Sequence, residues 1–531
     1  MKNFLYQSLP TLFALPTLFA LPIDRILIDK PYFVLSPNAS GEVGIPDQSM
    51  IVINVTLSNG ETVLRGYNAW QHTDLVISGP SLTSVVSTRP LPKVTTTWDL
   101  EGAYQEGSFI HGLMHREHGW LYHGIYKYYG YVTYARSYDE GITFTPFPNT
   151  GNINDSIIII SEGPMNIGES SNTGTGPQWA VQRSDDKGNS WLYLYVQDAF
   201  ARDPKTDHFV FAYTVARASL GHGESSLVWY KYYNNSFNEP GMGGRATAIS
   251  NLTGAKMIFV ESLQAWLAVD YGGSLMTSID GMIWNSIASG LSLFPVKPPA
   301  QPTSSFYQFS NILEYTSLIP SRGGNFLALD DSLWLFYCLV RATDKGGWNG
   351  GIRGLVAVEI QITSSSNVVN NNESIPLFLV SLHQYRSKSN QTLWSSVWPV
   401  DTLYYTQVSF LANLLTSPAV APPITALIGL LDCVWVENGS HFIARLGECG
   451  TVNASNAFPP LEPPDGSSIL TPGFLAPLGW ISEESNSYVP VGYKSITLWR
   501  CYSNFSFYSV TGSCATSDVN QTLLGYAYQK I

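Results

Sequence analysis

The chain is poor in charged residues, and it lacks basic runs. Only 13% of its 531 residues are Asp, Glu, Lys or Arg, and the formal net charge is −12. Binding to phosphates needs a basic face, so this balance argues against a nucleic-acid partner. Cys and His residues with the spacing of a zinc site are also missing, and we expect neither a metal nor another cofactor.

No apolar run is long and uninterrupted enough to be a membrane span. The most apolar stretch, 419–436, contains two prolines and Asp432 and is predicted to be a core segment. At the N-terminus, MKNFLYQSLPTLFALPTLFALP places Lys2 before an apolar stretch that prolines interrupt. This pattern predicts a signal peptide over residues 1–22. We therefore expect a secreted, extracellular protein without a transmembrane segment.

Asn-x-Ser/Thr sequons support the same prediction. Chance alone gives some sequons in a chain rich in Asn, Ser and Thr, yet their number beside a signal sequence favours an exported glycoprotein. The predicted acceptors are Asn38, Asn54, Asn154, Asn234, Asn251, Asn372, Asn390, Asn438, Asn453, Asn504 and Asn520.

Cysteine is scarce, with five residues in the chain. Cys433 lies close in sequence to Cys449, and Cys501 to Cys514, which predicts two local disulfides near the C-terminus. Cys338 remains, within the apolar run LWLFYCLV, and is predicted to be a buried thiol; a nucleophile is the alternative.

Helical periodicity is almost absent as well. Short alternating or aromatic runs such as MIVINVTL, WLYLYVQD and GLVAVEIQI recur between Gly, Asn, Asp and Ser. They predict strands joined by tight turns. So many strands in one long region indicate an all-β sandwich, barrel or propeller.

The stretch SYDEGITF, residues 137–144, predicts a particular hairpin turn. The Asp139 carboxylate would accept backbone N–H groups, Gly141 would supply a positive φ, and Phe144 would pack against neighbouring strands. Related stretches surround Asp186 and Asp280. We interpret all three as structural turns rather than as catalytic groups.

This turn pattern resembles the Asp-box of sialidases and related β-propellers. With that resemblance, strand counting gives blades of roughly 60–70 residues and about five blades over residues 45–370. We predict a propeller domain over 23–363, a polar linker over 364–375 and a second β domain over 376–531.

The second β domain contains three similar segments, which begin SLHQYRSK, DCVWVENG and ITLWRCYS. Each has an aromatic strand, a polar turn and a second aromatic strand, which favours a compact, trefoil-like domain. The last segment resembles an aromatic repeat module of secreted hydrolases, and the resemblance implies carbohydrate binding.

The turn motifs, HREHG and WYKYYNNSFNEPGMGG together resemble secreted β-propeller glycosidases. The resemblance implies hydrolysis of glycosidic bonds by paired carboxylates. Sialidase-type arginine and Tyr/Glu signatures are not evident. The alternative is a non-catalytic glycan-binding or attachment glycoprotein.

In such a propeller, the innermost strands would bring catalytic carboxylates together. Glu117 and Glu261 are predicted to end two innermost strands and to form the acid/base pair, with Asp99 as a third carboxylate. Ordinary surface or turn carboxylates are the alternative for all three.

Four further residues are candidates for substrate binding. His115 could hydrogen bond to a sugar; Arg136 and Arg217 could bind an acidic substrate or support turns; and Trp229 could stack on a sugar or fill space between blades. His111, His115, His118 and His123 also form a cluster in the sequence, for which a metal site is the alternative to sugar binding and to a structural role.

Overall fold

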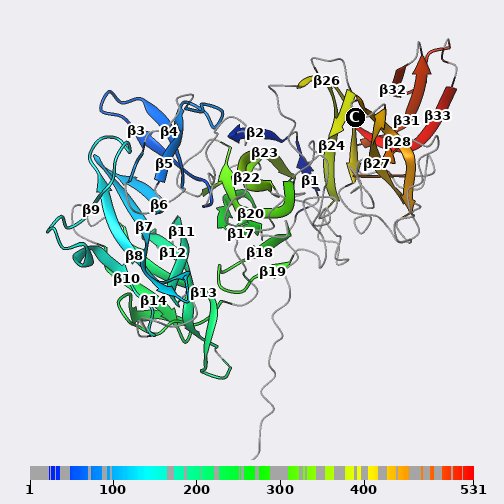
Figure 1. Ribbon diagram of the computed structural model, residues 1–531. Coiled ribbons are helices and arrows are strands. Elements are labelled where there is room, and N and C mark those ends of the chain that lie inside the picture. The colour runs from blue at the N-terminus through cyan, green and yellow to red at the C-terminus, as the bar shows by residue number, and fades with distance from the viewer. Residues whose placement is uncertain are drawn as a thin grey trace, which may run out of the picture.

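The computed structural model consists almost entirely of β-strands (Figure 1). It describes short pieces between 23 and 35, then chiefly 48–69, 73–86, 99–163, 173–184, 188–203, 205–220, 227–249, 256–269, 274–286, 309–321, 332–341 and 353–363, and thereafter the strands between 377 and 531. Within these residues there are 33 strands and two short 3-10 helices, Ile153–Ser156 and Glu261–Leu263, and no α-helix. The predicted all-β class is therefore confirmed.

Two sets of antiparallel strands follow each other along the chain, and the second joins the set after it in one ten-stranded sheet through a parallel pairing. A three-stranded sheet contains β3 (Ile51–Thr56), β4 (Thr62–Ala69) and β5 (Thr73–Gly79). The next set begins with β6 (Asp99–Glu106), β7 (Phe109–Tyr122) and β8 (Ile125–Ser137), and β9 (Thr145–Pro146) and β10 (Ile157–Ile159) extend it.

Two more antiparallel sets come next. The first contains β11 (Thr173–Ser184), β12 (Ser190–Arg202), β13 (Phe209–Ser219), β14 (Trp229–Tyr233) and β15 (Ser236–Pro240). The second contains β16 (Lys256–Val260), β17 (Ala265–Val269), β18 (Leu275–Ser278) and β19 (Asn285–Ser286). Every residue of β16 and β17 is buried, because both faces of these strands are covered.

A fifth antiparallel set leads into the C-terminal part. It contains β20 (Phe309–Pro320), β22 (Ser332–Arg341) and β23 (Arg353–Thr363), while β21 (Leu327–Ala328) pairs with β16. The N-terminal strands β1 (Arg25–Ile28) and β2 (Tyr32–Leu35) both pair with β23. Strand β1 also pairs in parallel with β24 (Leu377–Ser387). Strand β1 thus lies between β23 and β24.

The C-terminal strands pair mostly with their neighbours in sequence. They are β24, β25 (Thr392–Ser395), β26 (Tyr405–Leu415), β27 (Leu427–Glu437), β28 (His441–Asn453), β29 (Ser468–Ile469), β30 (Gly479–Ser482), β31 (Tyr493–Ser503), β32 (Ser506–Thr511) and β33 (Asn520–Lys530). The three similar sequence segments form the antiparallel pairs β24–β25, β27–β28 and β31–β32. The predicted strand–turn–strand form of each unit is confirmed, while a trefoil-like arrangement stays a prediction.

Candidate functional site

Glu101 occupies an irregular position on β6. The register between β6 and β7 shifts between the pairs Leu100–Met114 and Gly102–Leu113, so Glu101 is the extra residue of a β-bulge. A bulge redirects side chains and is common beside functional sites. Here it accompanies a carboxylate that is only 3% exposed.

Lys256, the first residue of β16, pairs with this carboxylate. Its Nζ lies 3.2 Å from Glu101 Oε2, and both side chains are almost completely buried. The ammonium also lies 5.4 Å from the ring centre of Trp179 on β11. Burial lowers the pKa of Lys256, and the Glu101 carboxylate opposes that shift. The starts of β6 and β16 therefore meet, and we call this the polar end of the sheets.

Asp99 and His115 lie opposite each other at the polar end. They are register partners of β6 and β7. Asp99 is half-buried, whereas His115 is 5% exposed. Burial and the nearby Lys256 lower the pKa of His115 to about 4, so its ring is neutral at neutral pH. A hydrogen bond with the Thr175 backbone opposes this lowering of the pKa.

A close backbone approach holds β11 beside His115. Thr173 and Gly174 on β11 pair in parallel with Tyr129 and Gly130 on β8. A Cβ at Gly130 would lie 2.0 Å from the Thr175 carbonyl oxygen and 3.1 Å from His115 Nε2. Position 130 therefore requires glycine, because there is no room for a Cβ.

Two amide side chains, Gln48 before β3 and Asn68 on β4, complete the polar end. Gln48 Nε2 donates to the carbonyl oxygen of Leu100, 2.8 Å away and next to the bulge. Asn68 Nδ2 donates to the Gln48 carbonyl oxygen at 2.8 Å. The side-chain oxygens Gln48 Oε1 and Asn68 Oδ1 are buried and accept no hydrogen bond within the described part. Carboxylate, amine, imidazole and amide groups thus meet at this end.

The β7–β8 hairpin extends beyond the polar end. Burial stops after His115, and the far part of the hairpin exposes Leu121 (73%), Ile125 (60%) and Tyr126 (54%). Glu117 lies at the base of this projection and is exposed. Burial and Glu117 raise the pKa of Tyr126 to about 12.

The predicted pair Glu117 and Glu261 is not brought together. Glu117 is on β7, which lies between β6 and β8 and is therefore not the first strand of its set. Because β7 runs antiparallel to β6, Glu117 lies beyond the start of β6, at the polar end. Glu261 follows the last residue of β16, at the opposite end, and Gln264 Nε2 donates to its Oε1 at 3.2 Å. The expectation that both occupy equivalent positions on innermost strands is wrong.

The other predicted binding residues pack against aromatic rings. The guanidinium of buried Arg136 lies 3.7 Å from the ring centre of Phe147, and its Nε donates to Tyr134 Oη at 3.1 Å. Arg217 stacks on Trp191 at 4.1 Å. Trp229 is 4% exposed, within the core. The burial of Trp229 matches its packing alternative, while a substrate-binding role for the two arginines stays a prediction.

The histidines do not converge. His111 lies four residues before His115 on β7, where it contacts Tyr134 and Glu106 rather than the polar end. His123 is at the exposed hairpin tip, and His118 is exposed. In the described part of the chain, the one group of three side chains with metal-ligand geometry is Cys501, Cys514 and Asp518.

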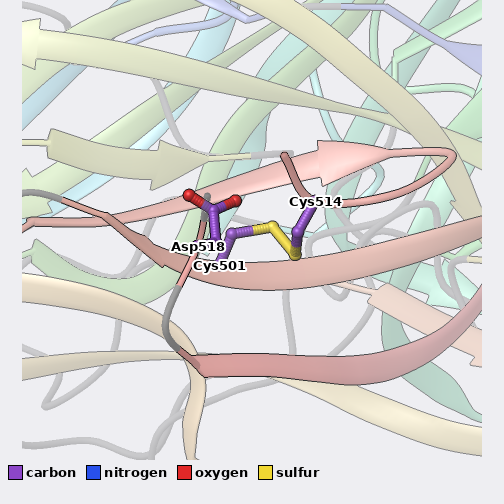
Figure 2. Close-up of side chains that lie close together, drawn as sticks. All are labelled: Cys501, Cys514 and Asp518. Atoms are coloured by element: carbon purple, nitrogen blue, oxygen red, sulfur yellow. A yellow bond between two sulfur atoms is a disulfide. The ribbon is translucent and has the colours of Figure 1, made fainter. Parts of the chain in front are cut away.

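That group is not a metal site, because its sulfurs are joined. Cys501 and Cys514 form a disulfide with a Cα–Cα distance of 5.6 Å, and Asp518 lies beside it (Figure 2). This predicted disulfide is confirmed. The side chains of Cys433 and Cys449 lie outside the described residues. Cys338 is a buried thiol on β22, as predicted.

The SYDEGITF turn has the hydrogen bonds that its structural interpretation predicts. Asp139 Oδ1 accepts from Thr143 N at 2.8 Å, Ser137 Oγ accepts from Gly141 N at 2.9 Å, and Gly141 has φ +82°. Phe144 is buried.

The turn at Asp280 repeats this geometry. Its Oδ1 accepts from Met282 N at 2.7 Å and from Ile283 N at 2.9 Å, and Trp284 is completely buried. Asp186 lies outside the described residues.

Few of the predicted glycan acceptors can be placed. Asn154 and Asn234 are exposed, and Asn54 is half-buried on β3. Asn453 and Asn520 are on β28 and β33, with side chains outside the described part. The remaining six acceptors, and residues 1–22 and 364–375, also lie outside it.

No known protein family matches this chain, and no characterised sequence matches it. Among solved structures, the catalytic domain of a Coprinopsis cinerea GH62 α-L-arabinofuranosidase is similar over 65% of this chain and 99% of its own, with 12% identity and a TM-score of 0.35. A mutant GH43 protein from Bacillus licheniformis (80% and 91%, 10% identity, 0.27) and a Trypanosoma rangeli sialidase complexed with sialic acid (92% and 96%, 9% identity, 0.26) are also similar. Likeness at these identities and TM-scores assigns no activity to this chain.

Proposed function

We propose that this protein is a glycoside hydrolase that acts at the polar end of its sheets. The observation that carries the proposal is the pair of carboxylates Asp99 and Glu101 on one bulged strand, with Lys256 and neutral His115 beside them. Hydrolysis of a glycosidic bond needs two carboxyl groups in different protonation states.

The two carboxyl groups lie in different environments. Lys256 favours the ionised form of Glu101, which suits a carboxylate that stabilises positive charge on a sugar ring. Asp99 is half-buried and can be reached by solvent, which suits the group that exchanges a proton with substrate or water. His115, being neutral, can donate or accept a hydrogen bond with a sugar hydroxyl.

The proposal also includes the architecture. We propose a propeller of about five blades, supported by the runs of antiparallel neighbours that follow one another along the chain, although β6 to β15 are joined into one ten-stranded sheet. We further propose that the chain is secreted after loss of residues 1–22 and is glycosylated. Residues 376–531 would bind carbohydrate as a separate unit.

The test is a panel of chromogenic glycosides, assayed with the wild type, Asp99→Asn and Glu117→Gln. We expect turnover that Asp99→Asn abolishes and Glu117→Gln largely keeps. Thermal unfolding of each variant checks that it is folded. Turnover that survives Asp99→Asn would contradict the proposed site.

A non-catalytic glycan-binding function is the second candidate. It is favoured by the exposed Leu121, Ile125 and Tyr126 on the β7–β8 hairpin, because aromatic and aliphatic surfaces suit the apolar faces of sugars. A glycan array that shows binding, together with no turnover in any variant, would establish this function instead.

A further inference from the structure

A cavity opens at the end of the sheets opposite the polar end. It lies between β6 and β11, has a volume of about 430 Å³ and is lined in part by Tyr104, Glu106, Gln182, Asn189 and Ser190. Small-molecule sites fall in this size range. The proposed hydrolase does not use it.

The local packing explains why the cavity is there. A Cβ at Gly102 on β6 would lie 2.9 Å from the Cβ of Ala180 on β11, so the two strands are in close contact at this level. Two residues further along each strand, Tyr104 and Gln182 line the cavity. The small residues Gly102 and Ala180 let the two strands approach each other, and the larger Tyr104 and Gln182 line the cavity next to this contact.

Tyr104 belongs to the cavity lining and carries a buried hydroxyl. It is 2% exposed, and its hydroxyl has no hydrogen-bond partner within the described residues. Its ring is stacked on His111 with 4.6 Å between ring centres and 9° between planes. Buried hydroxyls in folded proteins nearly always have a partner, so this one is expected to meet a ligand or water.

The groups around Tyr104 indicate a neutral, polyhydroxylated ligand. Gln182 and Asn189 supply amide groups, and Ser190 and Ser219 supply hydroxyl groups. Glu106 supplies an acceptor, and no Lys or Arg belongs to the described lining. Such a set matches sugar hydroxyls, which both donate and accept, and disfavours an anion.

We infer that this cavity is a second saccharide-binding site, specific for a neutral sugar and separate from the polar end. Binding would give Tyr104 Oη its missing partner and would hold β6 against β11 through the ligand. The inference does not depend on hydrolysis at Asp99.

The probes are D-glucose, D-galactose, D-mannose, D-xylose and L-arabinose, with N-acetylneuraminic acid as the anionic comparison. Calorimetry measures their binding to the full-length wild type and to Tyr104→Phe, Gln182→Ala, Asp99→Asn and the control Tyr230→Phe. Tyr230 is a matched control because it is an exposed tyrosine on β14, outside the cavity lining.

We expect at least one neutral sugar to bind. Tyr104→Phe and Gln182→Ala should each weaken its binding roughly three- to tenfold, the usual effect of one lost hydrogen bond. Tyr230→Phe and Asp99→Asn should leave it unchanged. Tyr104→Phe should keep or raise stability, because it removes an unpaired buried hydroxyl, so a loss of affinity cannot be attributed to unfolding.

Three results would overturn the inference: no neutral sugar binds, only the anionic sugar binds, or binding is unaffected by both cavity variants. Binding that Asp99→Asn removes and Tyr104→Phe leaves intact would place the sugar at the polar end. That outcome would reject the second site and keep the proposed function.

Discussion

The hydroxyl of Tyr67 donates a hydrogen bond to the carbonyl oxygen of Gly141 across 3.0 Å. Tyr67 is on β4, and Gly141 belongs to the turn after β8, so the bond joins two sheets. Tyr195 on β12 repeats the contact with Gly281 after β18, at 3.2 Å. Each turn therefore attaches its own sheet to a buried tyrosine of another.

Gly141→Ala should destabilise the protein more than Gly107→Ala. Both glycines have positive φ, but a Cβ at Gly141 would lie 2.4 Å from Tyr67 Oη, whereas Gly107 has open space around it. We expect about 1–3 kcal/mol of overpacking cost beyond the backbone strain that the two variants share. Urea unfolding of the two variants measures the difference in stability. Equal midpoints would show that the close approach of Tyr67 to residue 141 does not affect stability.

Replacing either Glu101 or Lys256 alone should lower the free energy of unfolding by about 3–5 kcal/mol, because the remaining buried charge loses its partner. Glu101→Gln and Lys256→Met are the single variants. The double variant should lose less than the sum of the two. A double-mutant cycle by chemical denaturation gives the coupling, and strict additivity would argue that the pair does not interact.

Stability should fall as the pH is lowered from 6.5 to about 4, partly because of His115. Its pKa is about 4 in the folded chain, against an ordinary value of 6.5, so protons bind preferentially to the unfolded state in this window. The lowered pKa has no effect on stability well above pH 6.5, about 3 kcal/mol of stability is lost by pH 4, and the loss levels off below that pH.

The measurement is a series of denaturation curves across this pH range, for wild type and His115→Gln. The slope of stability against pH should be smaller in the variant. Replacement of the exposed His208 by Gln is the control. A variant with the wild-type slope would show that His115 does not titrate differently on folding.

Removing the Cys501–Cys514 disulfide should weaken the C-terminal strands. The bond closes a short loop with a sequence separation of 13, for which about 3 kcal/mol of stabilisation is usual. The Cys501→Ser/Cys514→Ser double variant, followed by thermal unfolding, should show a lower midpoint that a reductant no longer changes. If the wild-type protein unfolds at the same temperature with and without reductant, the disulfide does not stabilise it.

Local features of the fold were predictable from sequence. The absence of a helical period, which is a property of residues close in sequence, predicts the strands. The residues of SYDEGITF are also close in sequence, and they predict the hydrogen bonds of Asp139. The disulfide between Cys501 and Cys514 was predictable for the same reason, since the two residues are close in the chain.

The site was predicted only in part, because its contacts are distant in sequence. Asp99 and His115 were both singled out, but Glu101 and Lys256 are 155 residues apart, and no local pattern signals a buried ion pair. The bulge at Glu101 breaks the two-residue alternation on which a strand prediction relies. Assigning β7 as an innermost strand then placed Glu117 in the wrong relation to Glu261.

Strand β1 has a consequence for the order in which the protein is made. Its residues Arg25–Ile28 pair with β23 on one side and with β24 on the other, more than 300 residues later in the chain. During synthesis β1 leaves the ribosome long before β23 and β24, so it has neither partner strand until the stretch near residue 380 has emerged. Its apolar side chains are a target for chaperones throughout that interval, and the sheet is completed only late in translation.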